Sequence, residues 1–180
     1  MALTATIHNI DIDLADADRQ VYESLALRVA RHPSESEEYL VARVLAYGLE
    51  YREGIAFSAG LSEPDEPTIA VRDLTGTLTS WIDVGTPDAA RLHKAAKTGS
   101  RVAVYTHKDP GQWLARLAGE RIHRAENIEL YAIDRRLIGA LVARLERRMA
   151  FSLSISEREL YVSIGTDTLT GLVSRHPLVR

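Results

Sequence analysis

The chain has 180 residues, a mass of 20.0 kDa, a formal net charge of −3 and a pI near 6.1. This length predicts one domain spanning residues 1–180, and the acidic balance excludes the strong overall positive charge of non-specific duplex-binding proteins while leaving room for a local basic patch. The absence of cysteine excludes disulfides, thiolate nucleophiles and cysteine-bound zinc, and suits a reducing cytoplasm.

The N-terminal segment, "MALTATIHNIDIDLADAD", has no basic stretch followed by an apolar run. No part of the sequence approaches the 18 consecutive apolar residues of a membrane-spanning helix. We therefore expect a cytoplasmic protein with no membrane partner.

Two segments near the N-terminus, 3–13 and 21–30, tend to alternate apolar and polar residues. This period of two predicts a β-hairpin, with "ADADR" as its turn. The spacing then becomes helical through "HPSESEEYLVARVLAYGLEYREG". Ser34 and Glu37 fit a capping box at the start of this helix, and Gly54 is the predicted stop.

The predicted first helix has one apolar face and one polar face. The apolar face is formed by Leu40, Val41, Val44, Leu45, Gly48 and Leu49. The polar side, expected to be solvated, is formed by Glu35, Tyr39, Arg43 and Glu50. Glu38 projects from the edge of the apolar face, where a carboxylate is costly without a partner. Two interpretations stay open for Glu38, a functional role or a pairing with an arginine.

The remaining sequence alternates strand and helix signals. We expect a loop over 59–67, strands over 68–72 and 77–84, a helix over 87–97, a strand over 101–106, a short helix over 110–119, a strand over 127–133, a helix over 134–147 and a hairpin over 150–165. Thr86 is the predicted N-cap of the helix that begins at Pro87, and Asp134 caps the last helix. This order predicts an α/β protein with a central mixed sheet flanked by helices and a hairpin at each end.

Asp83 stands near the carboxyl end of a predicted strand, where loops of parallel α/β units diverge and sites are common. Side chains alternate along a strand, so Trp81 and Asp83 face one side while Ile82 and Val84 face the other. Strands disfavour aspartate, which needs solvent, a cation or hydrogen bonds there. Asp83 is therefore either an acceptor for the next helix or a functional carboxylate.

Arg91 and Lys94 lie three residues apart on one face of the following helix, and Arg91 is the nearer of the two to Asp83. Each is a candidate cation for Asp83, and the alternative is a solvated or salt-bridging surface face. The loop before the strand adds the carboxylates Glu63, Asp65 and Glu66.

Hard cations such as Mg²⁺ bind carboxylate oxygens and keep several waters. Glu38, Asp65 or Glu66, and Asp83 would together form a Mg²⁺ or Mn²⁺ site if the fold brings them together. The six histidines lack paired ligand spacing, which argues against zinc. No phosphate-binding glycine loop and no G-x-S-x-G nucleophile elbow is present.

The segments "ARHPSESEEYLVARVLAYGL", "GLSEPDEP", "WIDVGTPD" and "RLHKA", followed by "VYT", together resemble the YaeQ family. The resemblance covers essentially the whole chain. It implies a compact α/β fold that is a variant of the PD-(D/E)XK nuclease core, in a bacterial cytoplasmic protein with no settled activity.

In that nuclease superfamily a helix glutamate, an aspartate before a central strand, and an acid-x-lysine on the next strand surround divalent metal. By resemblance, Glu38 matches the helix acid and Asp83 the strand acid. Two positions depart from the pattern. Gly85 stands where the superfamily has lysine, so Lys94 or Arg91 must substitute. Thr68 stands where the family has an aspartate, so Asp65 or Glu66 must supply the acid.

The sequence and this resemblance together predict a metal-dependent phosphodiesterase acting on nucleic acid. Its metal ligands would be Glu38, Asp65 or Glu66, and Asp83, and its cationic helper would be Lys94 or Arg91. The alternative is a catalytically degenerate protein of the same fold that serves as a binding or interaction module. A third interpretation treats the carboxylates as caps and salt bridges around a structural sheet.

Overall fold

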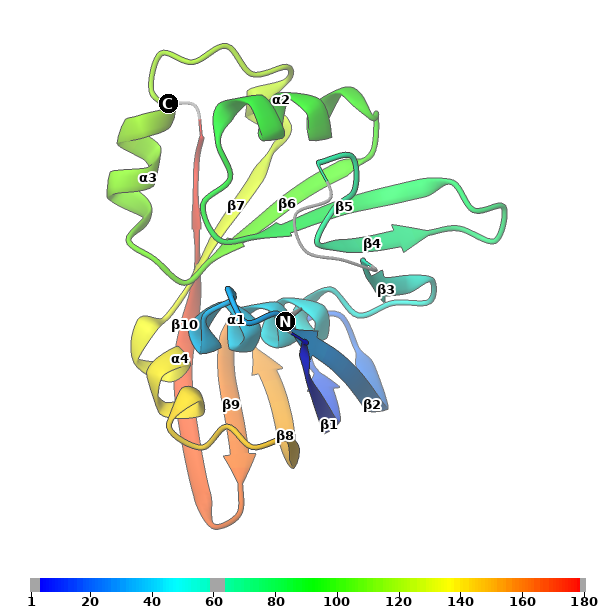
Figure 1. Cartoon of the computed structure of the whole chain (residues 1–180), viewed down its shortest axis with the longest axis vertical. Coiled ribbons are helices and arrows are strands. Elements are labelled where there is room, and N and C mark those ends of the chain that lie inside the picture. Colours follow the sequence, from blue (N-terminus) through cyan, green and yellow to red (C-terminus); the bar gives the residue numbers. More distant parts are fainter. Residues whose placement is uncertain (1–3, 59–63, 179–180) are drawn as a thin grey trace. The chain divides into compact units, whose positions relative to one another are not determined.

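The computed structural model describes residues 4–58 and 64–178, so Leu3 and Glu63 of the predictions above lie outside it (Figure 1). Within these ranges the chain has a mixed α/β fold with ten strands and four α-helices. It divides into two compact units. The first comprises residues 1–49 and 133–173, and the second comprises residues 50–132 and 174–180.

The first unit contains the N-terminal hairpin and the C-terminal strands. Its elements are β1 (Thr6–Asp16), β2 (Val21–Arg31), α1 (Glu37–Glu50), α4 (Arg135–Val142), β8 (Arg148–Ser156), β9 (Glu159–Ile164) and β10 (Asp167–His176). The unit includes α1 as far as Leu49 and β10 as far as Val173, and the last residues of both elements belong to the second unit. The strands follow the order β2-β1-β8-β9-β10. Both predicted hairpins, β1–β2 and β8–β9, are confirmed as antiparallel pairs, whereas β1 and β8 pair in parallel.

Strict alternation places the core of the first unit on one face of its sheet. Ile10, Ile12 and Leu14 of β1 are at most 3% exposed, whereas Asp11 and Asp13 between them are exposed. A Cβ at Gly48 would lie 2.9 Å from Leu153 of β8. The absence of a side chain at Gly48 therefore allows α1 to lie directly against the sheet.

The start and end of α1 differ from the prediction. The backbone N–H of Tyr39 bonds to the hydroxyl of Ser36, so Ser36 is the N-cap and the capping box at Ser34 and Glu37 was wrong. The Ser34 hydroxyl instead pairs with the His32 ring. The helix ends at Glu50, before Gly54, which takes a positive φ of 89° in the following turn.

The second unit contains the strand–helix units. Its elements are β3 (Ile55–Phe57), β4 (Ile69–Arg72), β5 (Leu78–Val84), α2 (Ala89–Lys97), β6 (Arg101–Thr106), α3 (Pro110–Leu117), a 3₁₀ turn η1 (Ala125–Asn127) and β7 (Glu129–Ile133). The last residue of β7, Ile133, is assigned to the first unit. The order is β7-β6-β5-β4-β3, with β5, β6 and β7 parallel to one another and β4 antiparallel to both of its neighbours. The sequence did not predict the short strand β3 or the long strand β10.

Helices α2 and α3 cover the same hydrophobic cluster of the second unit. The cluster is formed by Trp81, Leu92, Ala95, Val102, Val104, Trp113, Leu117, Ile128 and Leu130. Each fully buried large side chain of this kind contributes about 1.5–3 kcal/mol to stability. Since Trp81, Val102 and Leu130 come from β5, β6 and β7, both helices pack on one face of this sheet.

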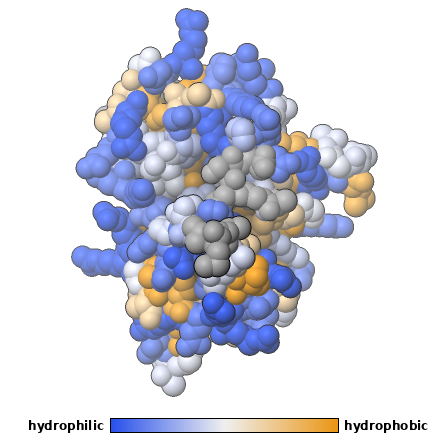
Figure 2. Space-filling view, in the orientation of Figure 1, coloured by the Kyte–Doolittle hydropathy of each residue, from blue (hydrophilic) through white to orange (hydrophobic). Residues whose placement is uncertain are grey.

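The structure confirms the predicted strands at 68–72, 77–84, 101–106 and 127–133 to within two residues at each end. Asp134 is confirmed as the cap of α4, which ends at Val142 rather than near residue 147. The N-cap of α2 is Asp88, not Thr86, because the Asp88 side chain accepts the N–H of Arg91. None of the helices in the described residues is long and apolar enough to span a membrane, and Figure 2 shows hydrophilic side chains over most of the face turned to the viewer.

Candidate functional site

Asp83 lies at the carboxyl end of β5, next to last in the strand and paired with Val104 of the parallel strand β6. It is 1% exposed. Gly85 follows β5 with a positive φ of 96°, a conformation that glycine adopts without strain, and its N–H bonds to the carbonyl of Tyr105. The chain therefore turns sharply just after Asp83, and α2 begins at Ala89, six residues after Asp83.

Both carboxylate oxygens of Asp83 accept hydrogen bonds from protein donors. Arg91 donates from Nε to Oδ2 at 2.7 Å and from Nη2 to Oδ1 at 2.9 Å. Thr68 adds its backbone N–H at 3.2 Å and its hydroxyl at 3.3 Å, both to Oδ1. This two-pronged arginine–carboxylate geometry is the strong form of an ion pair. The sequence predicted the partnership of Asp83 with Arg91 as one of two alternatives, and the structure contains it.

Arg91 reaches Asp83 because the Asp88 cap places it in the first turn of α2. Its Nη2 also donates to the carbonyl of Glu66 at 2.8 Å. The guanidinium carbon lies 5.4 Å from the centroid of the Trp81 ring, within the range of a cation–π contact. One guanidinium thus joins the end of β5, the start of α2 and the loop before β4.

Lys94, one turn further along α2, forms an ion pair with Asp65 of the same loop. Both side chains are largely exposed, at 48% and 76%. Solvent and salt screen such pairs, which contribute about 0–1 kcal/mol. The ion-pair partner of Lys94 is therefore Asp65 rather than Asp83.

Glu38, the predicted helix ligand, lies in the first turn of α1 in the first unit and is exposed. Asp65, Glu66 and Asp83 all belong to the second unit. The structure therefore brings Asp83, Arg91 and the Glu66 carbonyl together, and Lys94 with Asp65. The role of Glu38 stays a prediction.

The expectation of a solvated polar side on α1 was wrong. Glu35, Arg43 and Glu50 are 6%, 8% and 2% exposed. Arg43 donates to Glu35 at 3.2 Å and to the carbonyl of Ala30 at 2.7 Å. Burial raises the pKa of the Glu35 carboxyl, and the nearby Arg43 charge acts in the opposite direction. Sequence periodicity missed this pair because the two charges are compatible with burial only beside each other.

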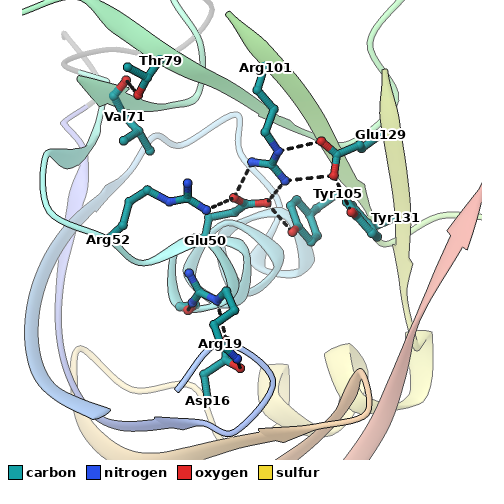
Figure 3. A network of polar contacts seen from close by, with 11 residues as sticks. Asp16, Arg19, Glu50, Arg52, Val71, Thr79, Arg101, Tyr105, Glu129 and Tyr131 are labelled. Atoms are coloured by element: carbon teal, nitrogen blue, oxygen red, sulfur yellow. Dashed lines mark hydrogen bonds and ion pairs between the residues drawn. The ribbon is translucent and has the colours of Figure 1, made fainter. Parts of the chain in front are cut away.

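Glu50 belongs to a second polar cluster in the second unit, which Figure 3 shows around Arg101. Arg101 donates to Glu50 at 2.8 and 3.0 Å and to Glu129 at 2.6 and 3.1 Å. Tyr105 donates its hydroxyl to Glu50 at 2.6 Å, and Tyr131 donates its hydroxyl to Glu129 at 2.7 Å. The strand residues of this cluster, Arg101, Tyr105, Glu129 and Tyr131, lie on the sheet face opposite α2 and α3.

The charges of this cluster change the pKa values of its members. Burial and the neighbouring Glu50 carboxylate raise the pKa of Tyr105 well above its usual value. Burial would raise the pKa of Glu129, but hydrogen bonds from Arg101 and Tyr131 outweigh it and lower the pKa. No sequence pattern indicated this cluster, because Arg101 and Glu129 meet only through the pairing of β6 with β7.

Carboxylate oxygens have the chemistry that a hard divalent cation requires. In the arrangement observed, however, both oxygens of Asp83 are held by Arg91 and Thr68, and Asp65 is held by Lys94. Among the residues that the structure describes, no three acids or histidines are grouped so that they could hold a metal ion. The donor types therefore fit Mg²⁺, and a metal ion could bind Asp83 only if Arg91 moved off its oxygens.

Comparisons with known proteins agree on one family. The family model described as "YaeQ protein" matches residues 1–171. Proteins described as uncharacterized YaeQ from Escherichia coli K12 and Salmonella typhi are each 30% identical, over 94% of this chain and 94% of their own length. The crystal structure of YaeQ from Xanthomonas axonopodis pv. citri matches with a TM-score of 0.85 at 32% identity, covering 96% of this chain and 98% of that one. The structure from Pseudomonas syringae gives 0.86 at 30% identity, covering 95% of each.

Proposed function

The chain belongs to the YaeQ family, and on that premise we propose that it is a nuclease-like phosphodiesterase that acts on nucleic acid in the bacterial cytoplasm. The proposal includes a PD-(D/E)XK-like core with Asp83 as its central acid. One observation carries it. A buried carboxylate at the end of a parallel strand holds a guanidinium from the following helix through two hydrogen bonds, at 2.7 and 2.9 Å.

An acid and a cation side by side are the two elements that phosphodiester cleavage uses. A fixed cation stabilises the negative charge that grows on the phosphoryl oxygens in the transition state. Arg91 is oriented for this role by Asp83, by the Glu66 carbonyl and by Trp81. Lys94 supplies a second positive charge one turn away, which offsets the absence of lysine at Gly85.

A divalent metal ion, when bound, would polarise a phosphoryl oxygen and lower the pKa of its bound water. Asp83, with Asp65 or Glu66 of the same unit, would hold it. Arg91 would then change its partner from Asp83 to the substrate phosphate, because two oxygens of a phosphate can accept from the same two N–H donors of the planar guanidinium. The exchange of partners makes the proposal testable at Arg91.

The first experiment measures cleavage. Purified protein is incubated with single-stranded, duplex and branched DNA and RNA in Mg²⁺ or Mn²⁺, beside the variants Asp83→Asn and Asp11→Asn. Asp11 is an exposed acid of the first unit and serves as the matched control. We expect cleavage by the wild type and by Asp11→Asn and none by Asp83→Asn. Cleavage no greater than that of Asp83→Asn in every condition would sink the proposal.

A second candidate function is a binding or interaction module that kept this fold and lost turnover. The observation in its favour is that Arg91 and Thr68 already occupy both oxygens of Asp83. Calorimetric titration with Mg²⁺ and Mn²⁺ separates the two candidates. The enzyme predicts binding that Asp83→Asn abolishes and that Arg91→Gln tightens, because Arg91 competes with the metal. The module predicts no binding in any of the three proteins.

A further inference from the structure

Positive charge is concentrated in one part of the second unit. Residues 88–127, from the N-cap of α2 to the end of η1, carry eight Lys or Arg and four Asp or Glu, a net charge of +4. The whole chain carries −3, so the rest of the sequence carries −7. Asp88 and Asp109, two of the four acids, are used as helix caps.

The elements that carry these charges lie on the same side of their sheet. Leu92 of α2 and Leu117 of α3 belong to one hydrophobic cluster, against which Ile122 also packs. The indole N–H of Trp113 donates to the carbonyl of Pro87 at 2.9 Å, which joins α3 to the start of α2. The N–H of His123 donates to His93 at 3.0 Å, which joins the segment after α3 to α2. Figure 1 shows these elements in green, within the second unit.

Three of the eight basic side chains are engaged in ion pairs, namely Arg91, Lys94 and Arg101. The other five are exposed and have no ion-pair partner among the residues that the structure describes. We call these five the basic face: Lys97, Lys108, Arg116, Arg121 and Arg124. Unpaired like charges repel one another, and a polyanion relieves that repulsion while releasing its own counterions.

The basic face has no exposed Phe, Tyr or Trp ring on which bases could stack. Trp113 is 2% exposed, and residues 88–127 contain no exposed Phe, Tyr or Trp. Proteins that bind single strands combine a basic groove with exposed aromatic rings. Contacts to phosphates alone fix position without reading sequence.

We propose that the basic face binds the phosphate backbone of a nucleic-acid duplex, without base preference. The inference deepens the proposed function by locating the substrate. It rests on that function in one respect, because the proposed function identifies the polyanion as nucleic acid. It does not need turnover, because the five cations lie outside the group formed by Asp83 and Arg91.

The test measures binding in EDTA, where metal-dependent cleavage cannot occur. Fluorescence anisotropy follows labelled duplex DNA, duplex RNA and the corresponding single strands of about 20 nucleotides over about 50–200 mM salt. We expect binding to at least one duplex, weaker binding to its single strands, and an affinity that falls steeply with salt.

The decisive comparison uses two quadruple variants of equal net charge. Lys97→Gln, Arg116→Gln, Arg121→Gln and Arg124→Gln together neutralise four of the five cations of the basic face and leave Lys108 unchanged. Arg28→Gln, Arg136→Gln, Arg147→Gln and Arg148→Gln neutralise exposed arginines of the first unit. Each phosphate contact contributes about 0.9 to the slope of log affinity against log salt. The slope of log affinity against log salt should therefore be about 3 to 4 units shallower for the first variant than for the wild type. The second variant should have the wild-type slope.

Two double variants divide these substitutions: one combines Lys97→Gln with Arg116→Gln, and the other combines Arg121→Gln with Arg124→Gln. Each should reduce the salt slope by about half as much as the quadruple variant. They keep the test decisive if the quadruple variant is less stable. Equal weakening by both quadruple variants, tighter binding of single strands than of duplex, or no binding by the wild type would overturn the inference. Duplex binding in EDTA without cleavage in Mg²⁺ would refute the proposed function and leave this inference standing.

Discussion

Asp83 is a buried carboxylate whose two oxygens are both held by donors. The free energy of placing a charge at a 1% exposed position is offset by the Arg91 guanidinium and by two bonds from Thr68. The Arg91 side chain keeps 25% of its surface in water. The pair therefore combines a fixed carboxylate with a cation that retains access to solvent.

Asp83→Asn should destabilise the protein. Removing one partner of a buried ion pair costs about 3–5 kcal/mol, and we expect the lower end because Arg91 can turn toward water. Urea unfolding at neutral pH measures the change, with Asp11→Asn as the control of equal charge. A loss of less than about 0.5 kcal/mol, the range of ordinary surface substitutions, would contradict this account of Asp83.

Glu129 gives the protein a pH dependence of known sign. Its pKa in the folded state is lowered, so its contribution to stability is present above the ordinary carboxyl pKa of 4.5 and is lost as pH falls through the folded value. Glu129→Gln should cost about 1.5–3 kcal/mol at neutral pH, the range for hydrogen bonds to charged groups. The difference from wild type, measured by urea unfolding, should shrink as the solution is made more acidic. A difference that stays constant with pH would show that the charge of Glu129 is not responsible.

At the scale of the element, the sequence predicted the strands and helices well and their ends less well. Alternation fixed the hairpin because Ile10, Ile12 and Leu14 all face one core. Caps were harder, because α1 and α2 each offer two polar residues near their first turn. The choice between Thr86 and Asp88 depends on which residue has its side chain beside the free N–H groups, and only the folded backbone decides that.

Asp88→Ala should therefore destabilise α2, while Thr86→Ala should not. Loss of an N-cap aspartate costs about 0.5–2 kcal/mol. Thermal or urea unfolding of the two variants measures the difference, and each variant is the control for the other. A larger loss of stability in Thr86→Ala than in Asp88→Ala would mean that Thr86 is the N-cap, as the sequence predicted.

Helix α1 shows a different kind of failure. Its charged residues Arg43 and Glu50 were assigned to water, yet both are buried. Arg43 pairs with Glu35 within the first unit, and Glu50 pairs with Arg101 in the second. A hydropathy pattern measures each residue alone, so it cannot detect charges that become compatible with burial through a partner.

At the scale of the whole molecule, the contacts that the sequence could not supply are those between distant segments. Strand β1 pairs in parallel with β8, so that Ile12 lies beside Phe151. The candidate site was partly predictable, because Asp83 and Arg91 are eight residues apart on consecutive elements. The Arg101 cluster was not, since Glu50, Arg101 and Glu129 come from three separate elements.

The chain contains two tryptophans, Trp81 and Trp113, and both lie in the hydrophobic cluster of the second unit. Tryptophan emission therefore reports on the second unit alone, whereas far-ultraviolet circular dichroism reports on the backbone of both. Coincident unfolding curves from the two signals would mean that the chain unfolds as one cooperative domain. Separate transitions would mean that each sheet keeps its own stability, and the natural positions of the tryptophans allow this to be measured without any added label.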